Sequence, residues 1–244
     1  SPEDNPPVLD KNNATDGDLL VAWALYRASV RWKQPNYAKA SLEILTDLRA
    51  HVGRTWNNLQ ILLPGADGFV VKDGIIVNLS YWLFPAFADF ERIDPKDGFW
   101  KNVTASGLAL LNSSRFGHWG LPTDWLALTD AQPRPAPQHA PRFGYDAIRI
   151  PLYLAWSGRS EPGLNPYDAY WQAHSSFVPA WYDVIGNMED GIGAPPGIVA
   201  VKTLVTAIAS NSTPAWEYGV RTDDYYSSIL RLLSQLAFME VARR

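Results

Sequence analysis

The fold is decided by the stretch Asp18–Val30, which reads DLLVAWALYRASV. After Asp18, Arg27 is the one charged residue in a run that is apolar on nearly every side of a helix. A helix of this kind is packed against neighbours on several sides. Pro35 ends the segment, and no helix or strand is expected before about Asp18. The stretch therefore predicts a well-packed helix inside a larger helical protein.

The same helical spacing recurs along the chain and predicts an all-α fold of about eight helices, arranged as successive hairpins. The further helices are expected at 37–52, 80–89, 98–112, 145–156, 166–185, 196–209 and 222–242. Gly53 is the expected C-cap of the second helix, and β-branched runs within 69–77 predict a small β-hairpin insertion. A loop rich in Pro and Trp covers 115–142, and such loops on a rigid scaffold usually carry function.

The composition excludes several classes of protein. The 244 residues include no Cys, which excludes disulfides, a thiol nucleophile and thiolate metal ligands. A net charge of −4 argues against a nucleic acid partner, and no apolar run is long enough for membrane insertion. The four His lack metal-binding spacing, and phosphate-loop and nucleophile-elbow motifs are absent, so we expect no metal and no cofactor. The 11 Trp and 11 Tyr exceed what a core needs and suit stacking on ring-shaped ligands.

The first candidate site is the polar segment Asn12–Asp18. Thr15 or Asp16 is expected to cap the first helix, with Asp18 in its first turn, where negative charge is favoured. The functional alternative is that Asp16 and Asp18, which bracket Gly17, hold sugar hydroxyls at the mouth of this helix. The residues alone leave both roles open.

Two further carboxylates lie among aromatic residues. Asp146 and Arg149 are three positions apart, so on a helix they share a face and pair. Such a pair is either structural or keeps the carboxylate ionised for work as a general base. Asp124 precedes Trp125, and it is either part of a turn pinned by a buried Trp or a hydrogen-bond partner of a sugar beside a stacking wall.

Five motifs follow one another in the order of a known family. They are ATDGDLLVAWAL at 14–25, LLPG at 62–65, NLSYW at 78–82, PTDW at 122–125 and YDAIR at 145–149. Together they resemble glycoside hydrolase family 8, and most of all its endo-β-1,4-glucanases (cellulases) encoded with bacterial cellulose synthase. Val21 stands where the family usually has Ile or Met, and Leu79 where it more often has Pro. The resemblance runs from about Asn12 to the C-terminus.

The resemblance implies a fold and a mechanism. The family fold is an (α/α)6 barrel of six inner and six outer helices, and its enzymes invert the anomeric configuration. In inverting enzymes a general acid protonates the leaving oxygen while a general base activates water. By resemblance, Asp146 is the general base and Asp16 is the second catalytic residue, which distorts the sugar or positions the water.

The resemblance also implies a cleft for cellulose-like β-1,4-glucan. The residues expected to bind substrate are carboxylates, one Arg and stacking aromatics: Asp18, Tyr81, Trp82, Trp119, Asp124, Trp125, Tyr145 and Arg149. The implied enzyme is periplasmic or secreted and supports cellulose synthesis, although the chain shows no signal peptide. The alternatives are a non-catalytic glucan-binding protein and a related family 8 activity, such as xylanase, lichenase or chitosanase.

One part of the family's machinery is not found. Its general acid is a Glu well upstream of the ATDGD motif, whereas fifteen residues precede Asp16 here and Glu3 does not match. We therefore expect residues 1–244 to form a single catalytic domain that is the C-terminal two-thirds to three-quarters of a barrel. The N-terminal segment with the acid is either a separate chain or lost by truncation. Without it, an apolar flank would be exposed.

Overall fold

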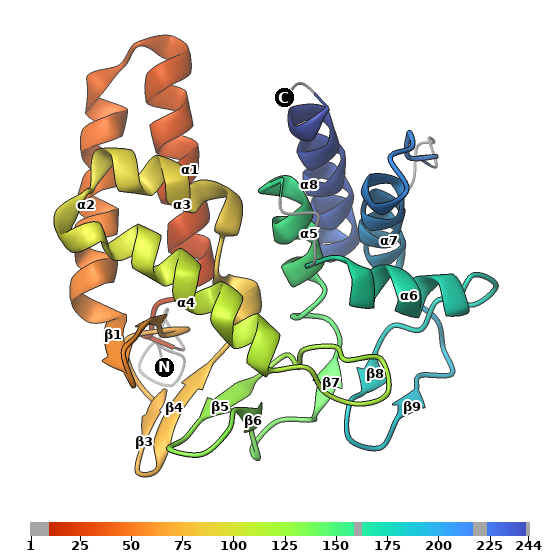
Figure 1. The fold of residues 1–244 in the computed structure, drawn as a ribbon. Helices are drawn as coiled ribbons and strands as arrows, with labels where there is room; N and C mark the ends of the chain where they lie inside the picture. Colours follow the sequence, from red (N-terminus) through yellow and green to blue (C-terminus); the bar gives the residue numbers. More distant parts are fainter. Residues whose placement is uncertain (1–9, 159–162, 217–223, 243–244) are drawn as a thin grey trace, which may run out of the picture.

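The computed structural model describes residues 10–158, 163–216 and 224–242. Eight α-helices lie in these ranges and pack in two groups, α1–α4 and α5–α8 (Figure 1). Their bounds are α1 Thr15–Trp32, α2 Pro35–His51, α3 Phe84–Ile93, α4 Phe99–Ser113, α5 Arg149–Trp156, α6 Asn165–Ala173, α7 Pro196–Ala209 and α8 Tyr225–Val241. Hairpins α1–α2 and α7–α8 agree with the predicted organisation.

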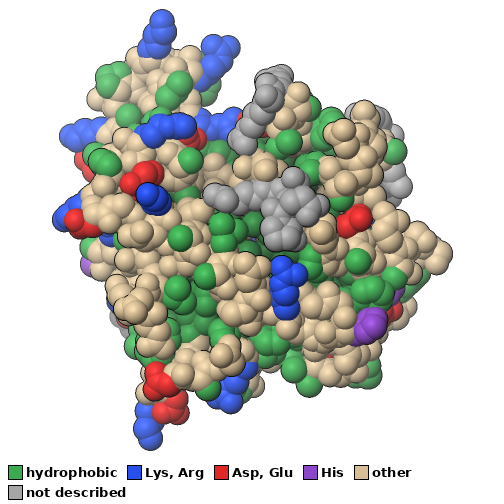
Figure 2. Space-filling view, viewed as in Figure 1, with side chains coloured by type: hydrophobic (Ala, Val, Ile, Leu, Met, Phe, Trp, Pro, Cys, Tyr) green, Lys and Arg blue, Asp and Glu red, His purple; other side chains and the backbone are tan. Residues whose placement is uncertain are grey.

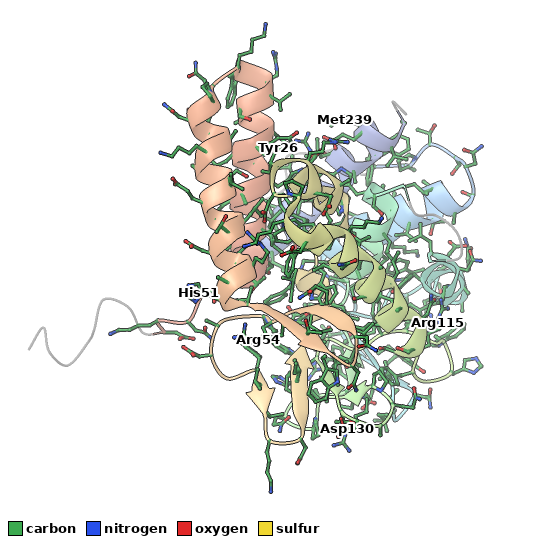
Figure 3. The ribbon with its side chains drawn as sticks, turned by 60° about the vertical axis from the view of Figure 1, so that its left-hand side comes forward. Tyr26, His51, Arg54, Arg115, Asp130 and Met239 are labelled. Carbon is green, nitrogen blue, oxygen red and sulfur yellow. The ribbon has the colours of Figure 1, made fainter. Side chains whose placement is uncertain are left out.

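The helices α1 and α2 form a long antiparallel hairpin. Lys33, in the left-handed conformation (φ 55°), ends α1, and Pro35 opens α2 at a position where a missing N–H costs nothing. The hydroxyl of Ser41 donates to the carbonyl of Ala22 at 2.7 Å and ties the two helices together. Figure 3 shows this hairpin rising beside the other helices, with His51 at the base of α2.

The start of α1 is set by tertiary contacts. Its N-cap residue is Ala14, and no side chain caps it, so the capping role predicted for Thr15 or Asp16 is wrong. Instead, the completely buried Thr15 donates its N–H to the carbonyl of Pro64 at 3.0 Å and its hydroxyl to the carbonyl of Leu63 at 2.7 Å. Asp16 does not cap the helix; its Oδ1 accepts the N–H of the next residue, Gly17, at 2.9 Å.

Several other element boundaries differ from the prediction. Gly53 is not the C-cap of α2 but the first residue of a strand, and Val52 is the cap. The helix expected over 145–156 begins at Arg149, and the one expected over 166–185 ends at Ala173. The segment 80–89 divides between a short 3₁₀ turn, η1 (Leu79–Tyr81), and α3. In each case the observed boundary adjoins a strand, a turn or a loop, which local periodicity does not reveal.

Three small antiparallel sheets lie at one end of the helices (Figure 1). The strands β1 (Gly53–Trp56) and β2 (Leu59–Leu62) form a hairpin, and its turn residues Asn57 and Asn58 have the positive φ (44° and 66°) of a type I′ turn. The predicted hairpin is present as β3 (Val70–Val71) and β4 (Gly74–Val77). The segment predicted as a loop extends it with β5 (Leu126–Leu128) and β6 (Arg134–Pro135). The third sheet comprises β7 (Arg142–Phe143), β8 (Tyr182–Asp183) and β9 (Met188–Glu189).

Large aromatic side chains fill much of the core. Four of the 11 tryptophans are at most 1% exposed: Trp82, Trp100, Trp156 and Trp171. The aromatic surplus therefore serves packing as well as any ligand. On the face shown in Figure 2, hydrophobic side chains gather over the middle, and basic side chains stand at the outer end of the α1–α2 hairpin. Among the described residues, no helix is long and apolar enough to cross a bilayer.

Candidate active site

The two predicted catalytic carboxylates meet at Arg149, the first residue of α5. Its Nη2 lies 3.1 Å from Oδ1 of Asp146 and 3.6 Å from Oδ2 of Asp16. The same nitrogen donates to Oγ of Ser80 at 3.0 Å. The three side chains around Arg149 come from the start of α1, from η1 and from the turn before α5. One guanidinium thus gathers carboxylates that are 130 residues apart in sequence.

Asp146 reaches this position from a turn. Residues 144–148 lead from β7 into α5, and the N–H of Ile148 donates to the carbonyl of Gly144 at 3.1 Å. The N–H of Arg149 donates to the carbonyl of Asp146 at 3.1 Å, which places both side chains on one side of the turn. The predicted ion pair is therefore confirmed, although Asp146 itself precedes the helix.

Ser80 and Asn78 orient Arg149, and neither was predicted from the sequence as a site residue. Oδ1 of Asn78 accepts the backbone N–H of Ser80 at 3.1 Å and its hydroxyl at 2.7 Å. Because that hydroxyl proton is directed to Asn78, a lone pair of Ser80 faces the guanidinium. Both residues are completely buried. The NLSYW motif contains them, but only its aromatic residues were chosen as candidates.

The charges of this cluster act on neighbouring tyrosines. Burial raises the pKa of Tyr81 to about 12, and Asp16 and Asp146 add to the rise. Burial also raises the pKa of Tyr153 to about 12. Burial by itself lowers the pKa of Arg149, but Tyr153, Asp146 and Asp16 outweigh it, so the pKa of Arg149 is raised. At neutral pH the two carboxylates therefore face a permanent cation and neutral hydroxyl groups.

Asp124 lies directly behind the turn that carries Asp146. It is 8% exposed, and its Oδ1 accepts the N–H groups of Gly144 at 3.0 Å and Ala147 at 2.7 Å. Burial raises the pKa of Asp124 to about 6, with the Ala147 N–H opposing the rise and the charge of Asp146 adding to it. The hydrogen bonds that its carboxylate accepts therefore come from backbone N–H groups.

Trp125 and Tyr81 form an aromatic group next to the cluster. The indole of Trp125 stacks on His139, with ring centroids 4.5 Å apart and an angle of 13° between the rings. It also stacks on Phe69 at 5.9 Å and meets the edge of Tyr81 at 6.1 Å. The ring of Tyr81 in turn lies 5.5 Å from Cζ of Arg149. Trp125 is therefore partly covered by His139, a residue that the sequence reasoning did not select.

Tyr145 stands at the rim of the site. It is 44% exposed and meets the ring of Tyr226 edge-on at 5.9 Å. The hydroxyl of Tyr226, from α8, donates to the carbonyl of Tyr145 at 2.8 Å. No sequence signal links these residues, which lie 81 positions apart.

Three predicted binding residues lie elsewhere. Trp82 is completely buried and donates its indole N–H to the carbonyl of Leu62 at 3.1 Å, so no ring face is open to a sugar and the stacking role is wrong. Trp119 packs against Tyr170 of α6, with ring centroids 5.8 Å apart. Asp18 accepts a hydrogen bond from Asn13 at 2.8 Å and lines a cavity of about 360 Å³ beside α2.

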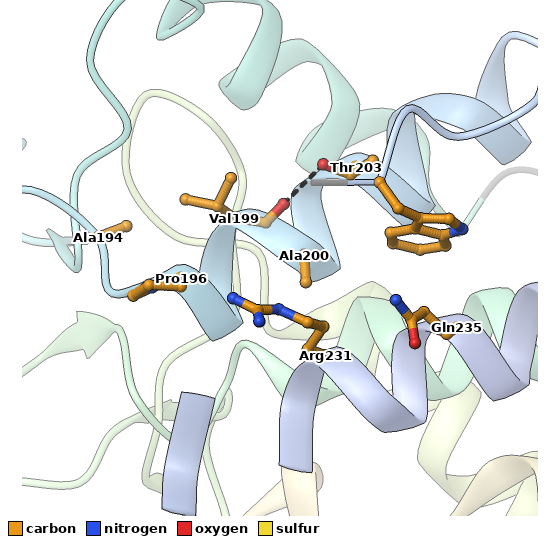
Figure 4. A pocket seen from close by; sticks show the side chains of 8 residues that line it. Ala194, Pro196, Val199, Ala200, Thr203, Arg231 and Gln235 are labelled. Carbon is orange, nitrogen blue, oxygen red and sulfur yellow. Dashed lines mark hydrogen bonds between the residues drawn. The ribbon is translucent and has the colours of Figure 1, made fainter. Parts of the chain in front are cut away.

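A cavity of about 220 Å³ lies between α7 and α8 (Figure 4). Arg231 and Gln235 extend into it from α8, and the hydroxyl of Thr203 donates to the carbonyl of Val199 at 2.9 Å. None of the predicted site residues lines it. Within residues 10–158, 163–216 and 224–242, no group of three or more His, Cys, Asp or Glu is arranged to hold a metal ion.

Comparison with known proteins shows the class of enzyme to which this fold and site belong. Residues 1–240 match the family model for glycosyl hydrolases family 8. The chain therefore belongs to glycoside hydrolase family 8, the family of (α/α)6 barrel enzymes that its motifs resemble, and the predicted fold class is confirmed.

Relatives at 37–39% identity carry glucanase names. The probable endoglucanase of Novacetimonas hansenii is 37% identical over 241 residues, which are 96% of this chain and 69% of that protein. The endoglucanase of Cellulomonas uda is 39% identical over 200 residues, 81% of this chain and 55% of that protein. The solved structure of the endo-β-1,4-glucanase CMCax from Acetobacter xylinum has a TM-score of 0.88 at 37% identity, covering 98% of this chain and 75% of that one. The chain thus spans between about half and three quarters of these relatives.

Proposed function

We propose that this chain is the larger part of an endo-1,4-β-glucanase that hydrolyses cellulose-like β-1,4-glucan with inversion. The endoglucanase names of the relatives support this substrate class. The observation that carries the proposal is the joining of Asp16 and Asp146 through Arg149. Glycoside hydrolysis relies on carboxyl groups placed around the scissile bond, and the family's motifs contribute both of these.

Asp146 acts as the general base in this proposal. Arg149 holds its Oδ1, and its side chain is 31% exposed, so the other carboxylate oxygen is available to a water molecule. That water forms a bond to the anomeric carbon while Asp146 takes its proton. The bond from the anomeric carbon to the leaving oxygen breaks, and a general acid protonates that oxygen.

Asp16 and Tyr81 position the reactants. Asp16 is held near Arg149 and is 24% exposed, which leaves its carboxylate open to the sugar at the cleavage point. Burial raises the pKa of Tyr81 to about 12, with Asp16 and Asp146 adding to the rise, so its hydroxyl is neutral at neutral pH. It can donate to one oxygen and accept from the attacking water.

The general acid comes from polypeptide outside these 244 residues, in the same single catalytic domain. Asp124 is a poor substitute, since it is buried behind the turn and occupied by two backbone donors. Glu3 lies outside the described residues. Exposed apolar side chains on α1 (Val21, 53%) and α8 (Leu232, 59%, and Met239, 47%) suit the packing of additional helices. The N-terminal segment that carries the general acid is either part of a longer chain or a separate fragment.

The partner is a β-1,4-glucan chain, whose glucose rings stack on aromatic side chains beside the site. These side chains belong to Trp125, Tyr81 and Tyr145. They border the Arg149 cluster, which comprises Arg149 and the three residues that it contacts, Asp16, Ser80 and Asp146. Cellulose is made at the cell surface, so the enzyme works in the periplasm or after secretion. The resemblance to glucanases encoded with cellulose synthase supports a role in cellulose export.

Release of reducing ends from carboxymethylcellulose tests the proposal. The 244-residue chain is assayed alone and together with the segment of the Novacetimonas relative that lies outside the match. We expect hydrolysis with the segment and little without it. Hydrolysis by the chain alone contradicts the external general acid. Binding of cello-oligosaccharides without hydrolysis in either case contradicts the enzymatic function and selects a glucan-binding protein.

A further inference from the structure

We infer that Asp124 is a positioning residue for Asp146, acting through the backbone of the turn that carries it, and not a residue that binds sugar. The inference rests on the proposed role of Asp146 as general base. Its geometric basis is that one oxygen of Asp124 accepts two N–H groups, from Gly144 at 3.0 Å and from Ala147 at 2.7 Å, which flank Asp146 on both sides.

Asp124 is itself fixed to the strands behind the site. Its own N–H donates to the carbonyl of Arg142 at 2.7 Å, and the hydroxyl of Thr123 donates to the same carbonyl at 3.3 Å. Two residues further on, β5 begins and pairs with β4. Asp124 therefore connects a hydrogen-bonded sheet to the turn at residues 144–148, so that the turn cannot move without breaking charge-assisted hydrogen bonds.

The second oxygen of Asp124 lies next to Gly144. A Cβ atom at this glycine would lie 3.0 Å from Oδ2 of Asp124 and 3.2 Å from Cβ of Trp181. Contacts this short require the neighbours to shift by a few tenths of an ångström, so the turn lies close against the carboxylate. With Oδ1 occupied by two donors and the residue only 8% exposed, little of the carboxylate is open to a sugar hydroxyl.

The electrostatic cost of this arrangement argues for a function. Burial raises the pKa of Asp124 to about 6, and the charge of the neighbouring Asp146 adds to the rise. A neutral Asn could accept the same two N–H groups without placing a second carboxylate so close. The carboxylate makes both bonds charge-assisted, and such bonds are shorter and stronger than neutral ones.

Amide hydrogen exchange and steady-state kinetics together test the inference. We expect Asp124→Ala to speed exchange of the Ala147 amide on the order of tenfold or more, since a hydrogen bond to a charged group is lost. In the chain supplied with the N-terminal segment, kcat should fall while KM for cello-oligosaccharides stays unchanged. Asp124→Asn, which keeps an acceptor but not its charge, should restore both properties only in part. Unchanged exchange, or a raised KM with unchanged kcat, overturns the inference, and the second result indicates a sugar contact.

A second variant covers the case in which Asp124→Ala does not fold. Gly144→Ala keeps Asp124 but places a Cβ 3.0 Å from its Oδ2, so the turn and the carboxylate must separate by a few tenths of an ångström, which should also speed Ala147 exchange and lower kcat. The matched controls are Gly191→Ala, where an added Cβ meets nothing within 4 Å, and Asp190→Ala, which removes another buried carboxylate that accepts two backbone N–H groups. Both controls should leave Ala147 exchange and kcat unchanged. If Gly144→Ala behaves like the controls, the inference is wrong.

The two proposals fail in different ways. If Asp146→Asn keeps full turnover, Asp146 is not the base and the proposed function fails, whereas Ala147 exchange still reports whether Asp124 holds the turn. If Asp146→Asn is inactive but Asp124→Ala changes neither exchange nor kcat, the function stands and the positioning role is overturned.

Discussion

Arg149 is the residue on which the site depends, because it contacts Asp146 at 3.1 Å, Asp16 at 3.6 Å and Ser80 at 3.0 Å through one nitrogen. We predict that Asp146→Asn abolishes turnover of carboxymethylcellulose, with a loss on the order of 10²–10⁴-fold or more, because an amide cannot take a proton from water. Cello-oligosaccharide binding, measured by calorimetry, should be preserved. Asp130→Asn, an exposed aspartate outside the cluster, is the control. Turnover that survives in Asp146→Asn refutes the assignment of the base.

The buried carboxyl group of Asp124 makes the free energy of unfolding depend on pH. Its pKa is raised from 3.8 to about 6, chiefly by burial, so the folded chain holds this proton more tightly than the unfolded chain does. The protonated carboxyl of Asp124 therefore contributes fully to the free energy of unfolding below pH 3.8, and this contribution is lost as the pH rises to about 6. The loss amounts to about 3 kcal/mol, since one pKa unit corresponds to about 1.4 kcal/mol.

Denaturation of the wild type and of Asp124→Asn between pH 4 and about 7 checks this sign. Asn does not titrate, so the free energy of unfolding of the variant should gain on that of the wild type as the pH rises through the window. A difference that stays constant with pH would show that Asp124 titrates normally in the folded chain.

Two of the tryptophans predicted to bind substrate should respond differently to truncation. Trp82→Ala leaves a cavity at a completely buried position and should lower the free energy of unfolding by about 3–5 kcal/mol. Trp125→Ala, at the stacked aromatic group, should weaken cello-oligosaccharide binding by about 0.5–1.5 kcal/mol beyond its buried area. Chemical denaturation and calorimetry measure the two quantities. Equal binding losses in the two variants would contradict the separation between core and cleft.

At the scale of elements, periodicity predicted where helices lie, but it placed both ends correctly only for α7 among the described helices. The range Pro196–Ala209 was predicted to the residue, because α7 is apolar along its length and begins at a proline. The start of α1 was misplaced, because Thr15 is held by the carbonyls of Leu63 and Pro64, far away in sequence. The strands β5 and β6 were likewise predicted as loop, since β5 pairs with β4, which lies about 50 residues earlier, and β6 pairs with β5.

In the candidate site, too, some residues were predicted from the sequence and others were not. Its charged members, Asp16, Asp146 and Arg149, stand in recognisable motifs and were predicted from the sequence. Trp82 was misjudged because an aromatic residue in a motif looks the same whether its ring is buried or open. Ser80 was missed because a serine becomes informative only when its hydroxyl is seen facing Arg149.

The contact of Thr15 gives a prediction for the whole of α1. Thr15→Val keeps the shape of the side chain but removes the donor to the carbonyl of Leu63, which is then buried without this partner. The free energy of unfolding should fall by about 1–3 kcal/mol. Chemical denaturation measures it, with Thr46→Val on the exposed side of α2 as the control. An equal effect of the two substitutions would refute the anchoring role.

At the scale of the whole molecule, two groups of helices meet around the Arg149 cluster. Arg27 of α1 forms an ion pair with Glu240 of α8, which also accepts the indole N–H of Trp156 at 2.8 Å. The first helix and the last described helix are thus joined by an ion pair. Exposed apolar residues on the same two helices, Val21 and Met239 among them, fit a barrel that further helices complete.

The anomeric configuration of the first product tests the central claim most directly. Cellohexaose is cleaved by the chain supplied with its N-terminal segment, and proton NMR follows the new reducing end before it mutarotates. Inversion at a β-linkage, with Asp146 activating water, predicts that the α-anomer is formed first. A β-anomer formed first, or the absence of any new reducing end, would contradict the assignment of the Arg149 cluster as the centre of an inverting β-1,4-glucanase.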